Sequence, residues 1–185
     1  MGKSVKEFSE FFKQLGAADV SHSNNTYLAH AVGVYRDLKS WSCTEEVCDA
    51  GMFHSVYGTE LFQKFTLPLE RRDEVRALIG ERAESLAYIN CALLRTSLDH
   101  SVEQNATSYL IKDRFKEQEV ELSLEDFNDL CTIHLCDWLE QIVRGDNWDR
   151  RREAFKLMAG RLGGIAEESY NRVYAQEPAK KIENN

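Results

Sequence analysis

Prolines, long apolar runs and paired cysteines are scarce in this chain, and each scarcity excludes a class of protein. Only two prolines occur in 185 residues, so long stretches can continue as helices without a break. No run of about 18 apolar residues is present, and the N-terminus lacks the apolar core of a signal peptide, so neither a membrane span nor secretion is expected. The five cysteines include no C-x-x-C pair, which argues against a disulfide framework or a zinc ribbon. We therefore expect a cytoplasmic protein with reduced thiols and no membrane partner.

Net positive charge is also missing. The formal net charge is −8 at pH 7, whereas a protein that binds nucleic-acid backbones needs a basic surface. The two arginine clusters, Arg71-Arg72 and Arg150-Arg151-Arg152, lie among acidic residues. We interpret them as solvated helix faces and keep a local anchor for an anionic ligand as the alternative. The sequence thus predicts no nucleic-acid partner.

What the chain does have is an ordinary globular composition with helical periodicity. Hydrophobic residues make up 43% and charged residues 29%, and this length suits one domain with its own core. We expect residues 1–177 to form a single domain and the polar residues 178–185 to form a disordered tail. Apolar residues spaced by three and four predict helices. The expected helices span residues 5–16, 26–41, 45–57, 60–65, 70–79, 81–97 and 123–143, with a last long helix after Asp146 or Asn147 that kinks at Gly163-Gly164.

Residues 107–122 depart from the helical pattern. Their β-branched and aromatic residues around a polar turn predict a small β-hairpin. Ser123, followed by Asp126, then caps a strongly apolar helix that reaches about Val143. The predicted fold class is therefore all-α, a helical bundle with one small hairpin near 107–122. A homodimer through the apolar C-terminal helix is one assembly that this pattern allows.

Two histidines lie beside apolar helix faces. His30 lies three positions after Tyr27 and four before Val34, and His54 follows the segment AGMF. A buried imidazole without a partner costs about 1–3 kcal/mol. Each ring therefore needs a carbonyl, a carboxylate or a metal ion, for which imidazole is the commonest ligand. From the residues alone, a satisfied core histidine and a metal ligand both remain open.

Asp137 is an acid within an apolar helix. It shares one helix face with three other residues, because Leu130, His134, Asp137 and Gln141 are spaced by four, three and four. If this face is buried, the carboxylate must be charge-paired or bound to a metal ion. If the face is exposed to solvent, Asp137 is an ordinary surface acid. The sequence leaves both alternatives open. We expect His134 to pack beside the site rather than bind an ion, and His100 to lie at the surface.

The order of these residues resembles that of HD-domain proteins, specifically the RelA/SpoT-type (p)ppGpp hydrolases. In that family a first histidine precedes a helix, a short acidic turn and the sequence A-A-L-L-H-D. Here His30 precedes His54, which ends the segment DAGMFH 24 positions later. The family's later K-L-A-D-R-L-H-N resembles HLCDWLEQ at residues 134–141, and GERAESLAYI resembles its F-G-x-E-V-A-x-L-V helix. The resemblance covers about residues 22–144 and implies an HD-type helical bundle.

The resemblance also implies a divalent-cation site. In an HD site, two histidines and two aspartates from separate helices hold the cation. His30, His54 and Asp137 match three of these four positions. The aspartate that follows the second histidine in the family is Ser55 here, so the implied ligand set is incomplete.

The segment FHSVYGTE resembles the F-H-S-x-Y-G-T-E motif of an uncharacterised HD-related family more closely than it resembles the hydrolases. In that setting Ser55 is a trait of the family, and Tyr57, Thr59 and Glu60 become candidate pocket residues. The opening HSNNTYLAH is similar to the start of the same family and adds His22. Ser55, Glu60 and His22 are thus the predicted catalytic residues, which would position water or substrate.

The resemblance leaves three functions open. The first is a metal-dependent hydrolase of a small phosphorylated or nucleotide-like substrate, in which a bound manganese, zinc or iron ion polarises a phosphoryl oxygen and lowers the pKa of water toward about 7. The second is a non-catalytic ligand-binding or regulatory relative, which fits the missing aspartate. The third is an iron-dependent oxygenase on the same scaffold, because two imidazoles and one carboxylate also suit iron(II).

Overall fold

The computed structural model of the chain describes residues 4–17, 19–22 and 24–179, and most of these residues are helical, as the sequence predicts. The α-helices are α1 (Val5–Gln14), α2 (Tyr27–Ser40), α3 (Glu45–Met52), α4 (Arg72–Ile79), α5 (Glu81–Ala92), α6 (Arg95–Val102), α7 (Leu124–Ile142), α8 (Arg152–Leu162) and α9 (Gly164–Tyr174). A 3-10 helix, η1 (Leu69–Arg71), leads into α4. No helix in these described ranges is long and apolar enough to cross a membrane. The tail expected at residues 178–185 lies outside the described residues from position 180 onward.

Two antiparallel strand pairs accompany the helices. Strands β3 (Ser108–Asp113) and β4 (Gln118–Ser123) pair along their whole length, which confirms the hairpin predicted near residues 107–122. The second pair, β1 (Ser21–His22) and β2 (Asn25–Thr26), is only two residues long and is not expected from the sequence. This short pair holds His22 beside the first turn of α2.

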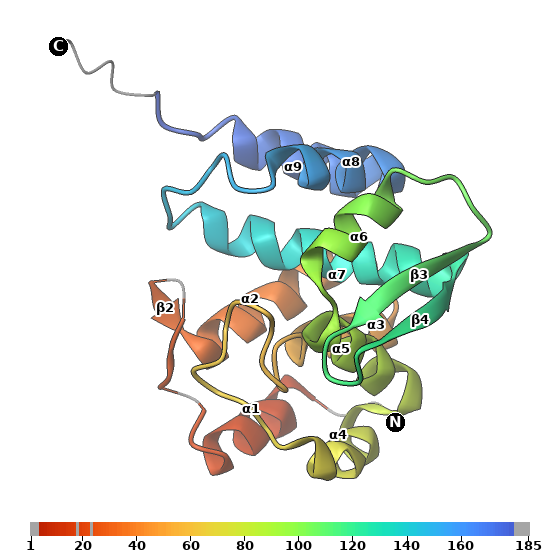
Figure 1. Cartoon of the computed structure of the whole chain (residues 1–185). Helices are drawn as coiled ribbons and strands as arrows, with labels where there is room; N and C mark the ends of the chain where they lie inside the picture. The colour runs from red at the N-terminus through yellow and green to blue at the C-terminus, as the bar shows by residue number, and fades with distance from the viewer. Residues whose placement is uncertain (1–3, 18, 23, 180–185) are drawn as a thin grey trace, which may run out of the picture.

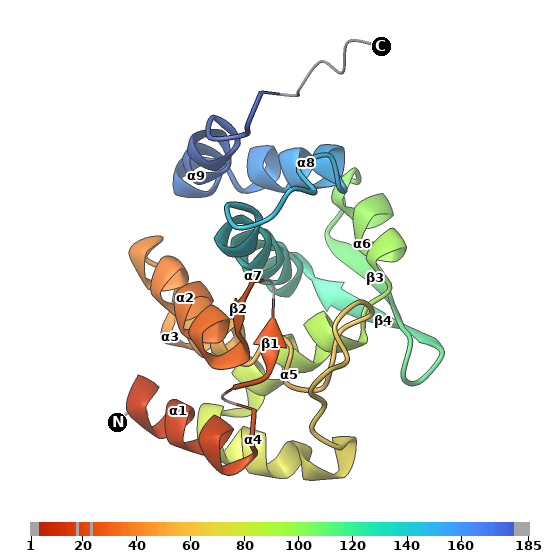
Figure 2. The same cartoon turned by 90° about the vertical axis from the view of Figure 1, so that its left-hand side faces the viewer.

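Helix α7 runs through the middle of the molecule. Figure 1 shows it between α8 and α9 on one side and α2, α3 and α5 on the other, and the turned view of Figure 2 shows the same order. Most of its side chains are buried, including Leu130, Ile133 and Trp138. Because neighbouring layers all contact α7, a side chain on α7 can meet residues from several distant segments.

Side-chain caps explain where several helices begin. Ser4, Thr26, Thr44 and Ser123 each have extended backbone, and each side chain accepts a backbone N–H from three positions on. A cap of this kind contributes about 1 kcal/mol.

The chain between α3 and η1 is less helical than predicted. The helix expected over residues 45–57 ends at Met52, and the helix expected over residues 60–65 is absent. The backbone N–H of Thr59 donates to the carbonyl oxygen of Phe62 at 2.8 Å. This direction is opposite to that of an α-helix, in which an N–H donates to a carbonyl earlier in the chain, so residues 59–62 close a loop. The result is a long loop that covers the middle of the bundle.

Two other predicted helices are divided. The helix expected over residues 81–97 breaks at Leu93, which is extended and pairs with Asp113 of β3. This pairing is a long-range contact, so the local apolar pattern does not contain it. The last helix begins at Arg152 and not after Asp146 or Asn147. It breaks at Gly163, where the sequence predicts a kink, and the φ of 63° and ψ of −165° at this residue lie in a region that favours glycine.

Candidate metal centre

Two histidines and one aspartate from three separate segments meet in the middle of the bundle. His30 lies on α2, His54 lies in the turn after α3, and Asp137 lies on α7. His30 Nε2 is 3.2 Å from His54 Nε2 and 3.0 Å from Asp137 Oδ1. His54 Nε2 is 3.4 Å from the same carboxylate oxygen. We call these three buried residues the triad. The structure brings together the three predicted ligands, and their binding of an ion stays a prediction.

The turn after α3 sets the orientation of the His54 ring. Its Nδ1 atom lies 2.7 Å from the carbonyl oxygen of Gly51, so Nδ1 carries the hydrogen and donates it. The lone pair of Nε2 then faces the other two members of the triad. Gly51 also permits close helix packing, because a Cβ there would lie 2.1 Å from Leu38 Cδ1 on α2. The side-chain amide of Asn90 on α5 donates to the His54 carbonyl at 2.7 Å. Helices on both sides of this turn therefore hold the ring in place.

A second carboxylate, Glu140, lies behind His30. His30 Nδ1 donates to Glu140 Oε2, and Arg144 pairs with both oxygens of this carboxylate. Gly33 on α2 leaves the necessary space, since a Cβ there would lie 2.6 Å from Glu140 Oε1. Metal-binding histidines commonly donate their other ring N–H to a carboxylate in this way. Glu140 is not among the candidate residues predicted from the sequence, although it lies three positions after Asp137 on α7 and so on a neighbouring part of the same face.

Charges within the triad offset one another. Burial alone would lower the pKa of His30, but hydrogen bonds with Asp137 and Glu140 raise it to about 9. Burial would raise the pKa of Asp137, yet the neighbouring imidazoles hold it well below its usual range. Burial lowers the pKa of His54. In the absence of a cation these directions describe an imidazolium at His30 between two carboxylates and a neutral imidazole at His54. A bound cation would take the place of the proton on His30 Nε2.

His22, predicted as catalytic, lies directly against the triad. Its ring stacks on that of His30 with the centroids 4.3 Å apart, and it contacts the ring of Phe62. Its Nδ1 atom is buried and has no hydrogen-bond partner among the residues that the structure describes. Burial, together with the nearby His30, lowers the pKa of His22 to about 4. A neutral imidazole with an unpartnered nitrogen therefore lies next to the three candidate ligands.

The other two predicted catalytic residues lie in different surroundings. Ser55 is buried, and its hydroxyl has no hydrogen-bond partner within the described part of the chain. Glu60 does not join the triad. Its carboxylate accepts the backbone N–H of Arg95 at 2.9 Å and is not part of the group of candidate metal ligands. Tyr57 also turns away, because its hydroxyl donates to the buried carboxylate of Glu84 on α5.

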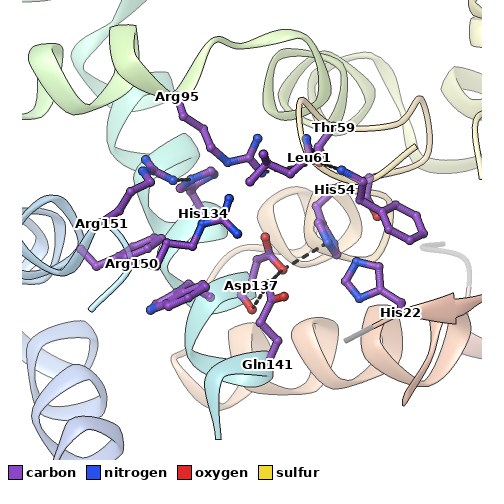
Figure 3. A pocket seen from close by; sticks show the side chains of 14 residues that line it. His22, His54, Thr59, Leu61, Arg95, His134, Asp137, Gln141, Arg150 and Arg151 are labelled. Carbon is purple, nitrogen blue, oxygen red and sulfur yellow. Dashed lines mark hydrogen bonds and ion pairs between the residues drawn. The ribbon is translucent and has the colours of Figure 1, made fainter. Parts of the chain in front are cut away.

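The triad borders a cavity of about 200 Å³. Its walls are formed by His22, His54, Ser55, Thr59, Leu61, Phe62, Arg95, His134, Asp137, Trp138, Gln141, Arg150, Arg151 and Phe155. Figure 3 shows Arg95, Arg150 and Arg151 on the opposite side of the cavity from His22 and His54. Arg95 is not among the residues predicted from the sequence, and Arg150 and Arg151 are predicted there to lie on a solvated helix face. The alternative interpretation, an anchor for an anion, agrees better with their place in this cavity.

His134 connects the two sides of the cavity. Its Nδ1–H donates to Asn90 Oδ1 at 3.1 Å, the same amide that holds the His54 carbonyl. Its Nε2 accepts a hydrogen bond from Arg151 Nη1 at 2.7 Å, and Arg151 also pairs with Asp99. Burial, together with the charge of Arg151, lowers the pKa of His134 well below its usual value, so the ring is neutral and can accept. His134 thus packs beside the triad, as the sequence predicts.

Comparison with known proteins adds one similarity. Residues 11–95 match the model of a family described as a domain of unknown function (DUF6817). The matched segment includes His22, His30 and His54, whereas Asp137 and the arginines before α8 lie outside it. No curated protein and no solved structure matches the chain. The relation to HD-domain proteins therefore stays a prediction from the sequence motifs.

Proposed function

We propose that this protein is a metal-dependent hydrolase of a small phosphorylated or nucleotide-like molecule. The observation that carries the proposal is the convergence of two imidazole nitrogens and one carboxylate oxygen beside a cavity with three arginines on its wall. The first group suits a divalent cation, and the second suits a phosphate. Neither feature alone supports phosphate-ester hydrolysis as well as the two together.

The triad fits a single divalent cation in spacing and in donor chemistry. Metal–nitrogen and metal–oxygen distances of about 2.0–2.2 Å place neighbouring ligand atoms about 2.8–3.6 Å apart in tetrahedral or octahedral sites. The separations within the triad, 3.0, 3.2 and 3.4 Å, fall inside this range. The hydrogen bond from His30 to Glu140 adds the outer carboxylate that commonly accompanies a metal-binding histidine.

Hydrolysis of a phosphate ester needs an activated water molecule and a positioned phosphoryl group. A cation held by the triad would polarise a phosphoryl oxygen and lower the pKa of water toward about 7. The chain's own residues bind and orient the substrate, with arginine N–H groups directed to the phosphate and with His22 and Ser55 offering unpartnered polar atoms. In the reaction the water oxygen forms a bond to phosphorus, the ester P–O bond breaks, and the alcohol leaves with a proton.

Metal analysis and a substrate screen test this proposal. Protein purified without added metal is expected to contain about one equivalent of manganese or zinc and to release phosphate from members of a panel of phosphomonoesters and nucleotides. His54→Ala and the isosteric Asp137→Asn are each expected to lose metal and turnover, because each removes one of three ligands. His100→Ala, at an exposed histidine, is the matched control and keeps both. Circular dichroism of every variant checks the fold.

Other outcomes point to the other functions. A wild-type protein with neither metal nor turnover contradicts the hydrolase and favours a ligand-binding relative, for which Ser55 in place of the aspartate is the supporting observation. Bound iron with oxygen consumption identifies an iron-dependent oxygenase, since the same donor set suits iron(II). Metal retained by both His54→Ala and Asp137→Asn excludes the triad as the binding site.

A further inference from the structure

Three arginines gather at one cavity although the chain has a net charge of −8. Arg95 is the first residue of α6, and Arg150 and Arg151 directly precede α8. Among the described residues that form the cavity, Asp137 is the one acid, and it faces the imidazoles of the triad. The wall away from the triad is therefore positive, and a positive concave surface attracts anions.

Arg95 is a buried cation with an incomplete set of partners. Only 15% of its side chain is exposed, and Nη1 has no hydrogen-bond partner in the described part of the chain. Glu60 Oε2 lies 3.6 Å from Nη1, beyond hydrogen-bond range, and Thr59 Oγ1 lies 3.5 Å from Nη2. Burial lowers the pKa of Arg95 overall, although the negative charges of Asp137 and Glu60 act in the opposite direction. An incompletely paired buried cation is unfavourable, whereas a bound anion would complete its pairing.

Arg151 is held in place and still has donors available. Its Nε atom donates to Asp99 at 2.9 Å, its Nη2 atom donates to the other oxygen of Asp99, and its Nη1 atom donates to His134. A guanidinium carries five N–H groups, so these three contacts leave two for a ligand. Its φ of 47° lies in the left-handed region, which is unfavourable for a residue with a side chain. Backbone strain of this kind concentrates at functional sites.

From this arrangement we infer that the cavity contains a phosphate subsite, in which Arg95 Nη1 and the Arg151 guanidinium bind the oxyanion and Arg150 borders its exposed rim. Guanidinium groups match the geometry of phosphate oxygens and form strong charge-assisted hydrogen bonds to them. The buried hydroxyl of Ser55, which has no partner in the described residues, is a further donor on the same cavity wall. The subsite rests on the proposed function, because it places the phosphoryl group between the arginines and the triad.

The rest of the ligand has room beside this subsite. A second cavity of about 220 Å³ shares Trp138, Gln141 and Arg150 with the first. Asn24 and Asn147 also line it, so amide groups form part of its wall. Amide and indole groups of this kind suit a polar organic molecule better than an acyl chain. The substrate class that fits both cavities is a phosphomonoester of a small polar molecule.

Calorimetric titration with inorganic phosphate tests the subsite without metal or turnover. Each protein is treated with a chelator, moved into a phosphate-free buffer of low ionic strength and titrated. Wild-type protein is expected to bind phosphate with saturation. Arg95→Met is expected to weaken binding about tenfold or more, because a charge-assisted hydrogen bond is lost. Arg150→Met, at an exposed position, weakens it less, and Arg36→Met, on the exposed face of α2 and away from both cavities, leaves it unchanged.

Asp137→Asn distinguishes failure of the subsite from failure of the proposed function. This variant loses a triad ligand but keeps the arginines, so phosphate binding persists while metal binding is lost. Absence of saturable phosphate binding in wild-type protein, or equal affinity in Arg95→Met, overturns the subsite even if the triad holds a metal. Arginine-dependent phosphate binding in a protein that takes up no metal supports the subsite and overturns only the hydrolase. If circular dichroism shows that Arg95→Met is unfolded, the phosphate affinity of Arg150→Met becomes the test of the subsite. An affinity equal to that of wild-type protein in that variant overturns the subsite.

Discussion

At the scale of single residues, the candidate metal centre depends on what each imidazole nitrogen faces. His30 has a carboxylate at both nitrogens, Asp137 at Nε2 and Glu140 at Nδ1. His54 donates from Nδ1 to the carbonyl of Gly51, so its Nε2 is available as a metal ligand. Ring orientation, and not residue type alone, therefore makes these side chains a set of ligands. The sequence identifies the residue types, but the hydrogen bonds that orient the rings come from the fold.

Glu140→Gln tests the contact behind His30. The variant is expected to bind zinc or manganese about 10- to 100-fold more weakly, because the outer carboxylate orients a metal-binding histidine and raises its basicity. Glutamine keeps the size of the side chain, so the circular dichroism spectrum should not change. Competition against a chelating dye measures the affinity. Glu168→Gln, at an exposed position on α9, is the control. Equal affinity in Glu140→Gln and wild-type protein would show that Glu140 does not act on the metal.

At the scale of elements, irregular segments place half of the cavity residues. The loop after α3 contributes Ser55 and Thr59, the break at Leu93 begins the helix that carries Arg95, and the connection before α8 carries Arg151. Several of these segments lie where the apolar pattern predicts continuous helix. Long-range pairing overrides that pattern, as the bridge from Leu93 to Asp113 of β3 shows.

The break between α8 and α9 provides a test at this scale. Gly163→Ala is expected to lower the free energy of unfolding by about 1–2 kcal/mol, because the backbone at this position favours glycine. Gly160→Ala is the matched control within α8 and should raise it by about 0.5–1 kcal/mol through better helix propensity. A Cβ at either position meets no atom within 4 Å, so the pair compares backbone effects alone. Urea denaturation measures both. If Gly163→Ala were as stable as Gly160→Ala, glycine conformation would not be what separates the two helices.

At the scale of the whole molecule, the triad connects segments that are distant in the sequence. His30 and Asp137 are 107 positions apart and lie on helices on two sides of one site. Helix α7 is the common partner, because layers on both of its sides contact it. A cation held by the triad would therefore connect α2, the turn after α3 and α7, and it would favour the folded chain over the unfolded one.

Metal should accordingly raise the thermal stability of the whole chain. At a free metal concentration of about 100 times the Kd, the stabilisation is about 2.7 kcal/mol, which corresponds to a rise in Tm of about 5–10 °C for a chain of this size. Differential scanning calorimetry of chelator-treated protein, with and without added zinc or manganese, measures this rise. Excess chelator should reverse it, and Asp137→Asn should not show it. A similar rise in Asp137→Asn would place the stabilising ion elsewhere.

The sequence by itself determined the helical class, the hairpin near residues 107–122 and the three candidate ligands. Helical periodicity, capping residues and turn signals are local, so they can be read from neighbouring positions. Only the tertiary structure decided that Glu140 lies behind His30, that Glu60 turns to Arg95, and that Arg95 and Arg151 face the triad. The physical reason is that these contacts join residues as far as 110 positions apart, and burial against α7 sets which of them meet.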